Sequence, residues 1–215
     1  MLSRRFWIAV ALLSALNVMA VSAFGQDEKN EIGGMLGRTF ISDQGIKGAT
    51  YFDPTIHFGK GLTFEGEYGR AIFVAPVYSV SAEALFAYNR DIDLNAGEYG
   101  HAVVPTDLKS YFVTPAVRVN LFPTTAVSPW VSLGAGYGHV SQSTQLDYSG
   151  ATPGKSKSGF AIEGGLGLDV KVWRKLSIRA GVRDFWGPEP DFPLAPTGKS
   201  RMHNFLVGGG AFWRF

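Results

Sequence analysis

From residue 31 onward, hydrophobic and polar residues alternate with a period of two in several stretches of the chain. Such alternation is typical of β-strands, whose successive side chains point to opposite faces. In residues 111–122, Val113 and Val117 lie on one face while Thr114 and Arg118 lie on the other. Because a helix would scatter these residues around its circumference, we predict strands.

The pattern predicts eight strands with connections of alternating length. The strands span residues 31–40, 49–58, 62–69, 111–122, 127–141, 160–172, 176–183 and 203–215. Tight turns are predicted at 59–61, 123–126 and 174–175, a shorter loop at 41–48, and long loops at 72–108, 142–157 and 186–202. Within 72–108, residues 80–88 fit a short helix, a strand extension or an additional strand.

Short turns on one rim and long loops on the other are typical of a transmembrane barrel. We therefore predict an all-β fold, an eight-stranded antiparallel transmembrane up-and-down β-barrel. An even number of strands places both termini on the rim of the tight turns, which is the periplasmic rim. The long loops then face outside the cell.

The first 23 residues have a different pattern. Two arginines precede an apolar run from residue 6 to about 21, and small residues end the segment at Ala23. This is the layout of a signal peptide, so we predict residues 1–23 as signal, with Ala20 as the second cleavage choice, and 24–215 as the barrel domain. An uncleaved anchor helix is the alternative.

Composition and charge agree with an exported β-protein. Of 215 residues, 27 are glycine, 16 phenylalanine and eight tyrosine, and none is cysteine. Removing residues 1–23 takes two of the 20 Lys and Arg residues and none of the 18 Asp and Glu residues, so the predicted mature chain is formally neutral. Without a basic patch, we expect no nucleic-acid partner.

The polar faces of the strands distinguish a membrane barrel from a soluble, lipocalin-like one, which would put its apolar face inside. They carry four acidic and four basic residues, namely Glu65, Glu67, Glu163, Asp169, Arg118, Lys171, Arg179 and Arg183. An eight-stranded barrel is only wide enough for side chains to fill its interior. We predict that these matched charges fill the lumen, with surface charges as the alternative.

Aromatic residues on the outward faces are expected near the two membrane interfaces. We place Tyr68, Tyr111 and Tyr137 near the outer ends of their strands and Trp213 and Phe215 at the inner end of the last strand. Strand parity turns Trp130 and Trp173 inward.

The last strand places Phe205, Val207, Gly209, Ala211, Trp213 and Phe215 on one face. It resembles the C-terminal recognition strand of outer-membrane barrels, which the insertion machinery reads, and Phe205, Val207, Trp213 and Phe215 are its candidate signal. The phrases at 62–68 and 128–137 resemble the third and fifth strands of the outer-membrane β-barrel family related to the membrane domain of OmpA. This resemblance implies a bacterial outer-membrane location. No sequence follows the eighth strand, so the peptidoglycan-binding domain of many relatives is not expected.

One constellation resembles an enzyme site. His139 and Ser141 resemble the His-x-Ser pair of outer-membrane lipid A deacylases, in which the histidine activates the serine for attack on an acyl ester. The sequence departs from that family at Gln142 and lacks a suitably spaced glutamate. The four histidines lack metal-ligand spacing, and we expect no metal, cofactor or enzymatic activity.

A small channel, as proposed for relatives such as OmpW, is the remaining alternative. The balanced lumenal charges favour a filled interior over an aqueous pore. We therefore predict a structural or surface-interaction role, with outer-membrane lipid and the insertion machinery as partners and an unidentified partner at the outer loops.

Overall fold

The computed structural model describes residues 28–42, 44–45, 55–56, 60–91, 104–146, 150–188 and 201–215. The predicted signal peptide, residues 1–23, lies outside these ranges. The barrel strands are β1 (Asn30–Ile41), β4 (Lys60–Val74), β5 (Tyr78–Asp91), β6 (Val104–Leu121), β7 (Val127–Leu146), β8 (Gly150–Lys171), β9 (Leu176–Trp186) and β10 (His203–Arg214). The described residues contain no helix that is long and apolar enough to cross a membrane.

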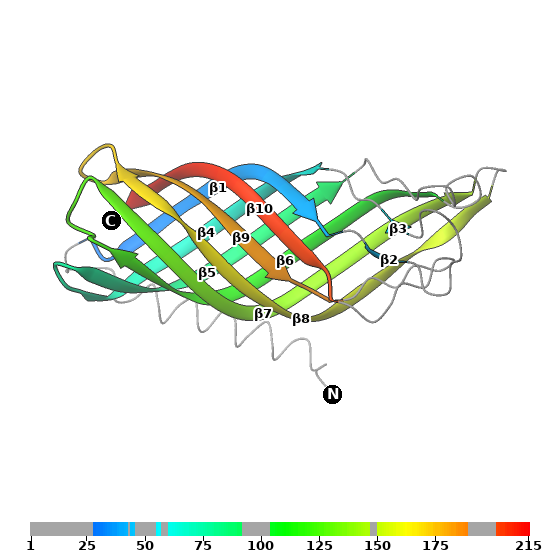
Figure 1. The fold of residues 1–215 in the computed structure, drawn as a ribbon, viewed down its shortest axis with the longest axis horizontal. Helices are drawn as coiled ribbons and strands as arrows, with labels where there is room; N and C mark the ends of the chain where they lie inside the picture. The colour runs from blue at the N-terminus through cyan, green and yellow to red at the C-terminus, as the bar shows by residue number, and fades with distance from the viewer. Residues whose placement is uncertain are drawn as a thin grey trace, which may run out of the picture.

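The eight strands form a closed antiparallel barrel in which each strand pairs with its sequence neighbours in the wall (Figure 1). β1 closes the barrel against β10, with Glu31 opposite Arg214 and Ile41 opposite Asn204. Two backbone bonds join the ends of the wall: Asn30 N–H donates to the Phe215 carbonyl at 3.0 Å, and Phe215 N–H donates to the Asn30 carbonyl at 2.9 Å. The predicted fold class is confirmed.

The prediction that residues 49–58 form a wall strand is wrong. β1 pairs directly with β4. Within 49–58, the described residues Thr55–Ile56 form the two-residue strand β3, which pairs with β2 (Gln44–Gly45) outside the barrel. The rest of that range lies outside the described residues. The alternation from Phe52 to Phe58 is therefore not sufficient to identify a strand of the wall.

The strand that replaces it is β5, in the segment that the sequence left open. A turn at residues 75–77 reverses the chain, with Ala75 N–H donating to the Tyr78 carbonyl at 2.9 Å. Pro76 lies inside this turn, where its missing N–H costs no ladder bond. Because β5 supplies the eighth strand, the predicted count is right although one of its members is not.

Because β5 takes the place of the predicted strand at 49–58, one tight turn also differs from the prediction. Residues 60–61 begin β4 at the outer rim, so the prediction of a periplasmic turn at 59–61 is wrong. Three short connections, at 75–77, 122–126 and 172–175, lie on the rim that holds the C-terminus. The β6–β7 turn includes Phe122 in a left-handed conformation with φ of 51°.

The predicted long loop at 142–157 is also wrong, because β7 runs to Leu146 and β8 starts at Gly150. These two strands extend beyond the ends of the other strands at the outer rim (Figure 1). The polar composition of this hairpin hides its pairing from a reading based on hydrophobic alternation.

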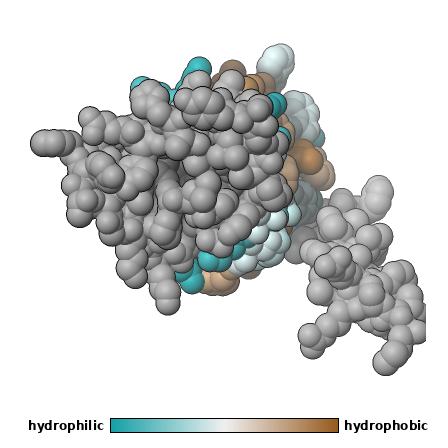
Figure 2. Space-filling view, turned by 90° about the vertical axis from the view of Figure 1, so that its right-hand side faces the viewer, coloured by the Kyte–Doolittle hydropathy of each residue, from teal (hydrophilic) through white to brown (hydrophobic). Residues whose placement is uncertain are grey.

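The barrel wall has the reverse polarity of a soluble protein. Outward positions carry large apolar side chains, among them Leu133 with 68% of its surface exposed, whereas many polar and charged side chains are buried inside. Figure 2, an end-on view from the outer rim, shows hydrophobic residues on the flank of the barrel. An apolar outer wall around a polar interior is expected for a barrel solvated by lipid.

Two of the predicted aromatic positions need correction. Tyr68 is outward but lies in the inner half of the wall, where its hydroxyl donates to Asn30 Oδ1 at 2.9 Å. Trp173 is 75% exposed because it belongs to the β8–β9 turn, where strand parity no longer applies. Trp130, in contrast, is inward and 1% exposed, as strand parity requires.

Candidate functional site

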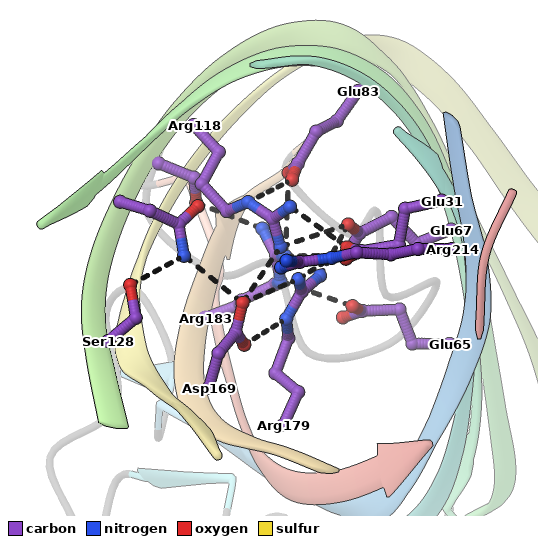
Figure 3. Close-up of polar contacts among 12 residues, drawn as sticks. Glu31, Glu65, Glu67, Glu83, Arg118, Ser128, Asp169, Arg179, Arg183 and Arg214 are labelled. Carbon is purple, nitrogen blue, oxygen red and sulfur yellow. Dashed lines mark hydrogen bonds and ion pairs between the residues drawn. The ribbon is translucent and has the colours of Figure 1, made fainter. Parts of the chain in front are cut away.

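Three buried arginines occupy the lumen, Arg118 on β6 and Arg179 and Arg183 on β9. The positions of β9 alternate strictly, so both of its arginines point inward together with Ser177 and Phe185. Their guanidinium groups converge with carboxylates from the opposite wall (Figure 3). The lumen therefore contains a charge network whose members are far apart in the sequence.

Arg183 joins four strands. Its Nη1 donates to Glu163 Oε1 at 2.8 Å and to Ser132 Oγ at 2.9 Å. Its Nη2 donates to Glu67 Oε2 at 2.9 Å, and its Nε lies 3.1 Å from Glu65 Oε1. The guanidinium also lies 4.7 Å from the centre of the Trp130 ring, a favourable position for a cation next to an aromatic face.

Arg179 forms the second centre of the network. It forms a bidentate pair with Asp169, from Nε at 2.7 Å and from Nη2 at 3.0 Å. Nη2 also donates to Glu31 at 2.6 Å, and Nη1 donates to Glu67. The guanidinium is 3.9 Å from the centre of the Phe212 ring. The planar donors of arginine suit this bidentate and stacked arrangement.

Arg118 completes the centre of the lumen. Its Nη2 donates to Glu31 Oε1 at 2.9 Å, and its Nε lies 2.7 Å from Glu83 Oε1. Arg214 on β10 adds a contact from its Nε to Glu31 Oε2 at 2.9 Å. Because Ser132 belongs to β7, every strand of the wall contributes at least one side chain to this network.

The structure places seven of the eight predicted lumen residues in this network; Lys171 is exposed and stands apart from it. Lys171 has inward parity, but it is the last residue of β8, where the lumen opens. The sequence analysis missed Glu31, Glu83 and Arg214. Glu83 lay in the segment that was not assigned to a strand. Glu31 and Arg214 alternate with apolar outward neighbours, Ile32 for Glu31 and Trp213 and Phe215 for Arg214, so strand parity could have found both.

Carboxylates outnumber guanidinium groups in the network. The acidic members are Glu31, Glu65, Glu67, Glu83, Glu163 and Asp169, and the basic members are Arg118, Arg179, Arg183 and Arg214. Glu67 contacts three of these arginines, whereas Glu65 contacts only Arg183. Neither carboxylate oxygen of Glu65 has a hydrogen-bond partner among the described residues. The predicted balance of four and four is thus an acidic excess of two.

Two apolar clusters lie in the lumen on the outer side of the network. The first contains Ala87, Phe112, Ala161, Phe185 and Leu206, with the Phe112 and Phe185 rings stacked at 4.9 Å. The second contains Ile41, Leu108, Val140 and Met202 and lies nearer to the outer rim than the first. All of these side chains are at most 7% exposed. Charged and apolar side chains thus fill successive levels of the lumen.

The periplasmic end of the lumen is more open. A cavity of about 170 Å³ lies between the network and the periplasmic rim. Its lining includes Asn30, Glu31, Ser79, Arg118 and Arg214. This cavity is large enough for a few water molecules. It borders one side of the charge network.

The candidate His-x-Ser pair lies on the outward face of β7. His139 Nδ1 bonds to Ser158 Oγ on β8 at 2.7 Å, and the imidazole stacks on Tyr111 at 4.9 Å. Ser141 is two residues farther along β7, opposite Lys109 and Ser156 in the neighbouring strands. The hydrogen-bond partner of His139 is therefore Ser158 on the neighbouring strand, and not Ser141.

The four candidate insertion-signal residues lie on the outward face of β10. Phe205, Val207, Trp213 and Phe215 are between 41% and 49% exposed. Strand parity predicted that these four side chains point outward. An exposed apolar strand face is available to both lipid and an assembly partner.

The sequence matches the family described as the outer membrane protein β-barrel domain over residues 8–211, and the chain belongs to this family. No protein with a curated description matches it. Neisserial surface protein A has a similar structure, with a TM-score of 0.57 and 12% identity over 86% of this chain and 97% of that chain. OprG from Pseudomonas aeruginosa has a TM-score of 0.52 and 14% identity over 89% of this chain and 99% of that chain.

The family match and the fold of these relatives place the protein in the bacterial outer membrane, as the sequence predicted. The contact of the outward apolar wall with lipid, which the sequence also predicted, stays a prediction. In such barrels the rim near the chain ends, here the one with the connections 75–77, 122–126 and 172–175, faces the periplasm, and the opposite rim with the projecting β7–β8 hairpin faces the exterior.

Proposed function

We propose that this protein is a structural or surface-interaction barrel with a closed lumen, rather than a channel or an enzyme. The observation that carries this proposal is the filling of the lumen at successive levels. The charge network spans all eight strands of the wall, and the stacked rings of Phe112 and Phe185 lie beyond it. A hydrated path would have to cross both levels.

The energetics support a permanent filling. Arg183 and Arg179 are fully buried, and each makes several charge-assisted hydrogen bonds, which are stronger than bonds between neutral groups. Opening a water path through these groups would separate cations from carboxylates that are held by different strands. The small channel, the first alternative, is therefore disfavoured.

Conductance in planar lipid bilayers tests the closed lumen. The folded protein is reconstituted and recorded at both polarities, and its folding is checked by the dependence of its electrophoretic mobility on heating. We expect no steady conductance above that of bilayers treated with detergent alone. A steady, protein-dependent conductance would show an open path and refute the closed lumen.

The proposal that the protein is not an enzyme has its own support. In acyl hydrolases of the serine type, a histidine activates the serine and a carboxylate orients the histidine. Here the His139 ring bonds to Ser158 and makes no contact with a carboxylate among the described residues. The arrangement fits a polar cross-strand pair.

A lipid A assay tests this point. The natural protein, Ser141→Ala and Ser158→Ala are incubated with lipid A, and released fatty acid is measured. We expect no release from any of them. Release that disappears in Ser141→Ala or in Ser158→Ala would establish a hydrolase with that serine as its nucleophile.

Because the lumen is closed in this proposal, other molecules would contact the outer surfaces of the barrel. The β7–β8 hairpin extends farthest beyond the outer rim (Figure 1). Rigid scaffolds commonly carry binding residues on such projecting connections. We propose that this hairpin and the neighbouring outer connections make the contacts outside the cell.

A further inference from the structure

The outward face of the wall carries a group of cations on three adjacent strands, toward the outer rim. They are Lys60 on β4, Arg90 on β5 and Lys109 on β6, all exposed. Arg90 lies directly opposite Lys109, and Leu62, two residues from Lys60, lies opposite Arg90. Neighbouring strands are about 4.8 Å apart, so the three strands span roughly 10 Å across the wall, with Lys60 offset by two residues along β4. We call them the cation arc.

Arg38 on β1 adds a fourth positive charge at the edge of the cation arc. Its Nη1 donates to the carbonyl of Lys60 at 2.9 Å, which brings the guanidinium toward the outer rim. Lys60 Nζ in turn lies 5.6 Å from the centre of the Phe40 ring, its cross-strand neighbour. Both side chains therefore keep their charges on the outer surface of the wall.

Aromatic residues lie directly on the membrane side of the cation arc. Tyr88 precedes Arg90 by two residues on the outward face of β5, and Tyr111 follows Lys109 by two on the outward face of β6. Tyr88 and Tyr111 are direct cross-strand partners, and Tyr111 continues the row to His139. Such aromatic rows mark the interface between hydrocarbon and headgroups, so the cation arc lies at headgroup level.

Two cations of the arc, Arg90 and Lys109, face each other across β5 and β6. Both residues have contacts of their own within the protein, but guanidinium and ammonium groups have several donors and can bind a phosphate in addition. At the same level, the described outward positions of β8 hold Ser156 and Ser158 instead.

We propose that the cation arc binds the phosphate groups of the phosphorylated glycolipid that forms the outer leaflet of the outer membrane. The location favours this partner, because the three side chains project from the lipid-facing wall at the level of the outer headgroups. The charge selects the phosphate, which accepts charge-assisted hydrogen bonds from Lys and Arg. The acyl chains of the same molecule would then cover the apolar wall below Tyr88 and Tyr111. This site is independent of the closed lumen.

The test compares lipid A that carries both phosphates with lipid A from which both have been removed. The protein is reconstituted in nanodiscs of phosphatidylcholine, and bound lipid A is counted by native mass spectrometry. The triple variant Lys60→Ser, Arg90→Ser, Lys109→Ser removes the cation arc. The matched control Lys171→Ser, Arg174→Ser, Lys175→Ser removes the same charge from exposed or half-buried positions at the periplasmic rim.

We expect the natural protein and the periplasmic control to prefer the phosphorylated form. The triple variant should lose about 100-fold in affinity for that form and bind the dephosphorylated form unchanged, given the usual attraction of three cations to an anionic membrane surface. Single Lys109→Ser should lose about fivefold, which keeps the test usable if the triple variant does not fold. Equal affinity of the natural protein for both forms, or an equal loss in the control, would overturn the proposal.

Discussion

The guanidinium of Arg183 on β9 reaches across the lumen to the carboxylate of Glu67 on β4, with Nη2 and Oε2 2.9 Å apart. The two residues are separated by 116 positions in the sequence. In the wall, β10 and β1 lie between their strands. This ion pair thus connects two distant parts of the barrel through its interior, and it makes Arg183 a sensitive point for stability.

Removing the charge of Arg183 should destabilise the barrel strongly. Arg183→Met leaves Glu65, Glu67 and Glu163 without a shared cation, and breaking one side of a buried ion pair costs about 3–5 kcal/mol. Urea-induced unfolding in lipid vesicles measures the loss. The double variant Arg183→Met, Glu163→Gln should recover part of it. Unchanged unfolding of Arg183→Met would show that the network contributes little to stability.

The acidic members of the network should differ in their contributions. Glu67 contacts three arginines, so Glu67→Gln should lower the free energy of unfolding by about 3 kcal/mol. Glu65 contacts one arginine and belongs to the side with excess charge, so Glu65→Gln should cost less than about 1 kcal/mol. The same unfolding assay compares the two variants. A larger loss of stability in Glu65→Gln than in Glu67→Gln would contradict the expectation that the carboxylate with more arginine contacts contributes more.

Closure of the barrel should depend on a missing side chain at Gly210. A Cβ at this position of β10 would lie 1.8 Å from the carbonyl oxygen of Gly34 on β1. Gly210→Ala should therefore force the closing strands apart and cost at least about 1–3 kcal/mol. Gly164→Ala is the matched control, because no atom lies within 4 Å of its added Cβ. Equal unfolding curves for the two variants would contradict this explanation.

The C-terminal aromatic residue should matter more for assembly than for the finished barrel. The backbone of Phe215 bonds to Asn30, and a substitution keeps these bonds, unlike a deletion. Phe215→Ser should reduce the amount of folded protein in the outer membrane of living cells while leaving unfolding in vesicles nearly unchanged. Phe86→Ser, which also removes an outward phenylalanine, is the control. An equal reduction for both variants would indicate a general loss of lipid contact instead of a recognition signal.

The sequence by itself determined the fold class and the direction of most side chains. Period-two alternation is a local property, because each strand position fixes the face of its neighbour. This is why the inward positions of Arg118, Arg179 and Arg183 and the outward face of β10 could be read without coordinates. The insertion role of that face and the lipid contacts of the wall remain predictions.

Only the tertiary structure decided which strands form the wall and which charges meet inside it. The segment at 49–58 alternates but does not supply a wall strand, and β5 supplies one although the sequence left residues 80–88 open between helix and strand, because the closed hydrogen-bond ladder selects the pairing. The register that follows brings Glu83 to Arg118 and Glu31 to Arg179. It also aligns Lys60, Arg90 and Lys109 on one arc. Contacts between strands depend on register and closure, and neither of these is encoded in a single strand.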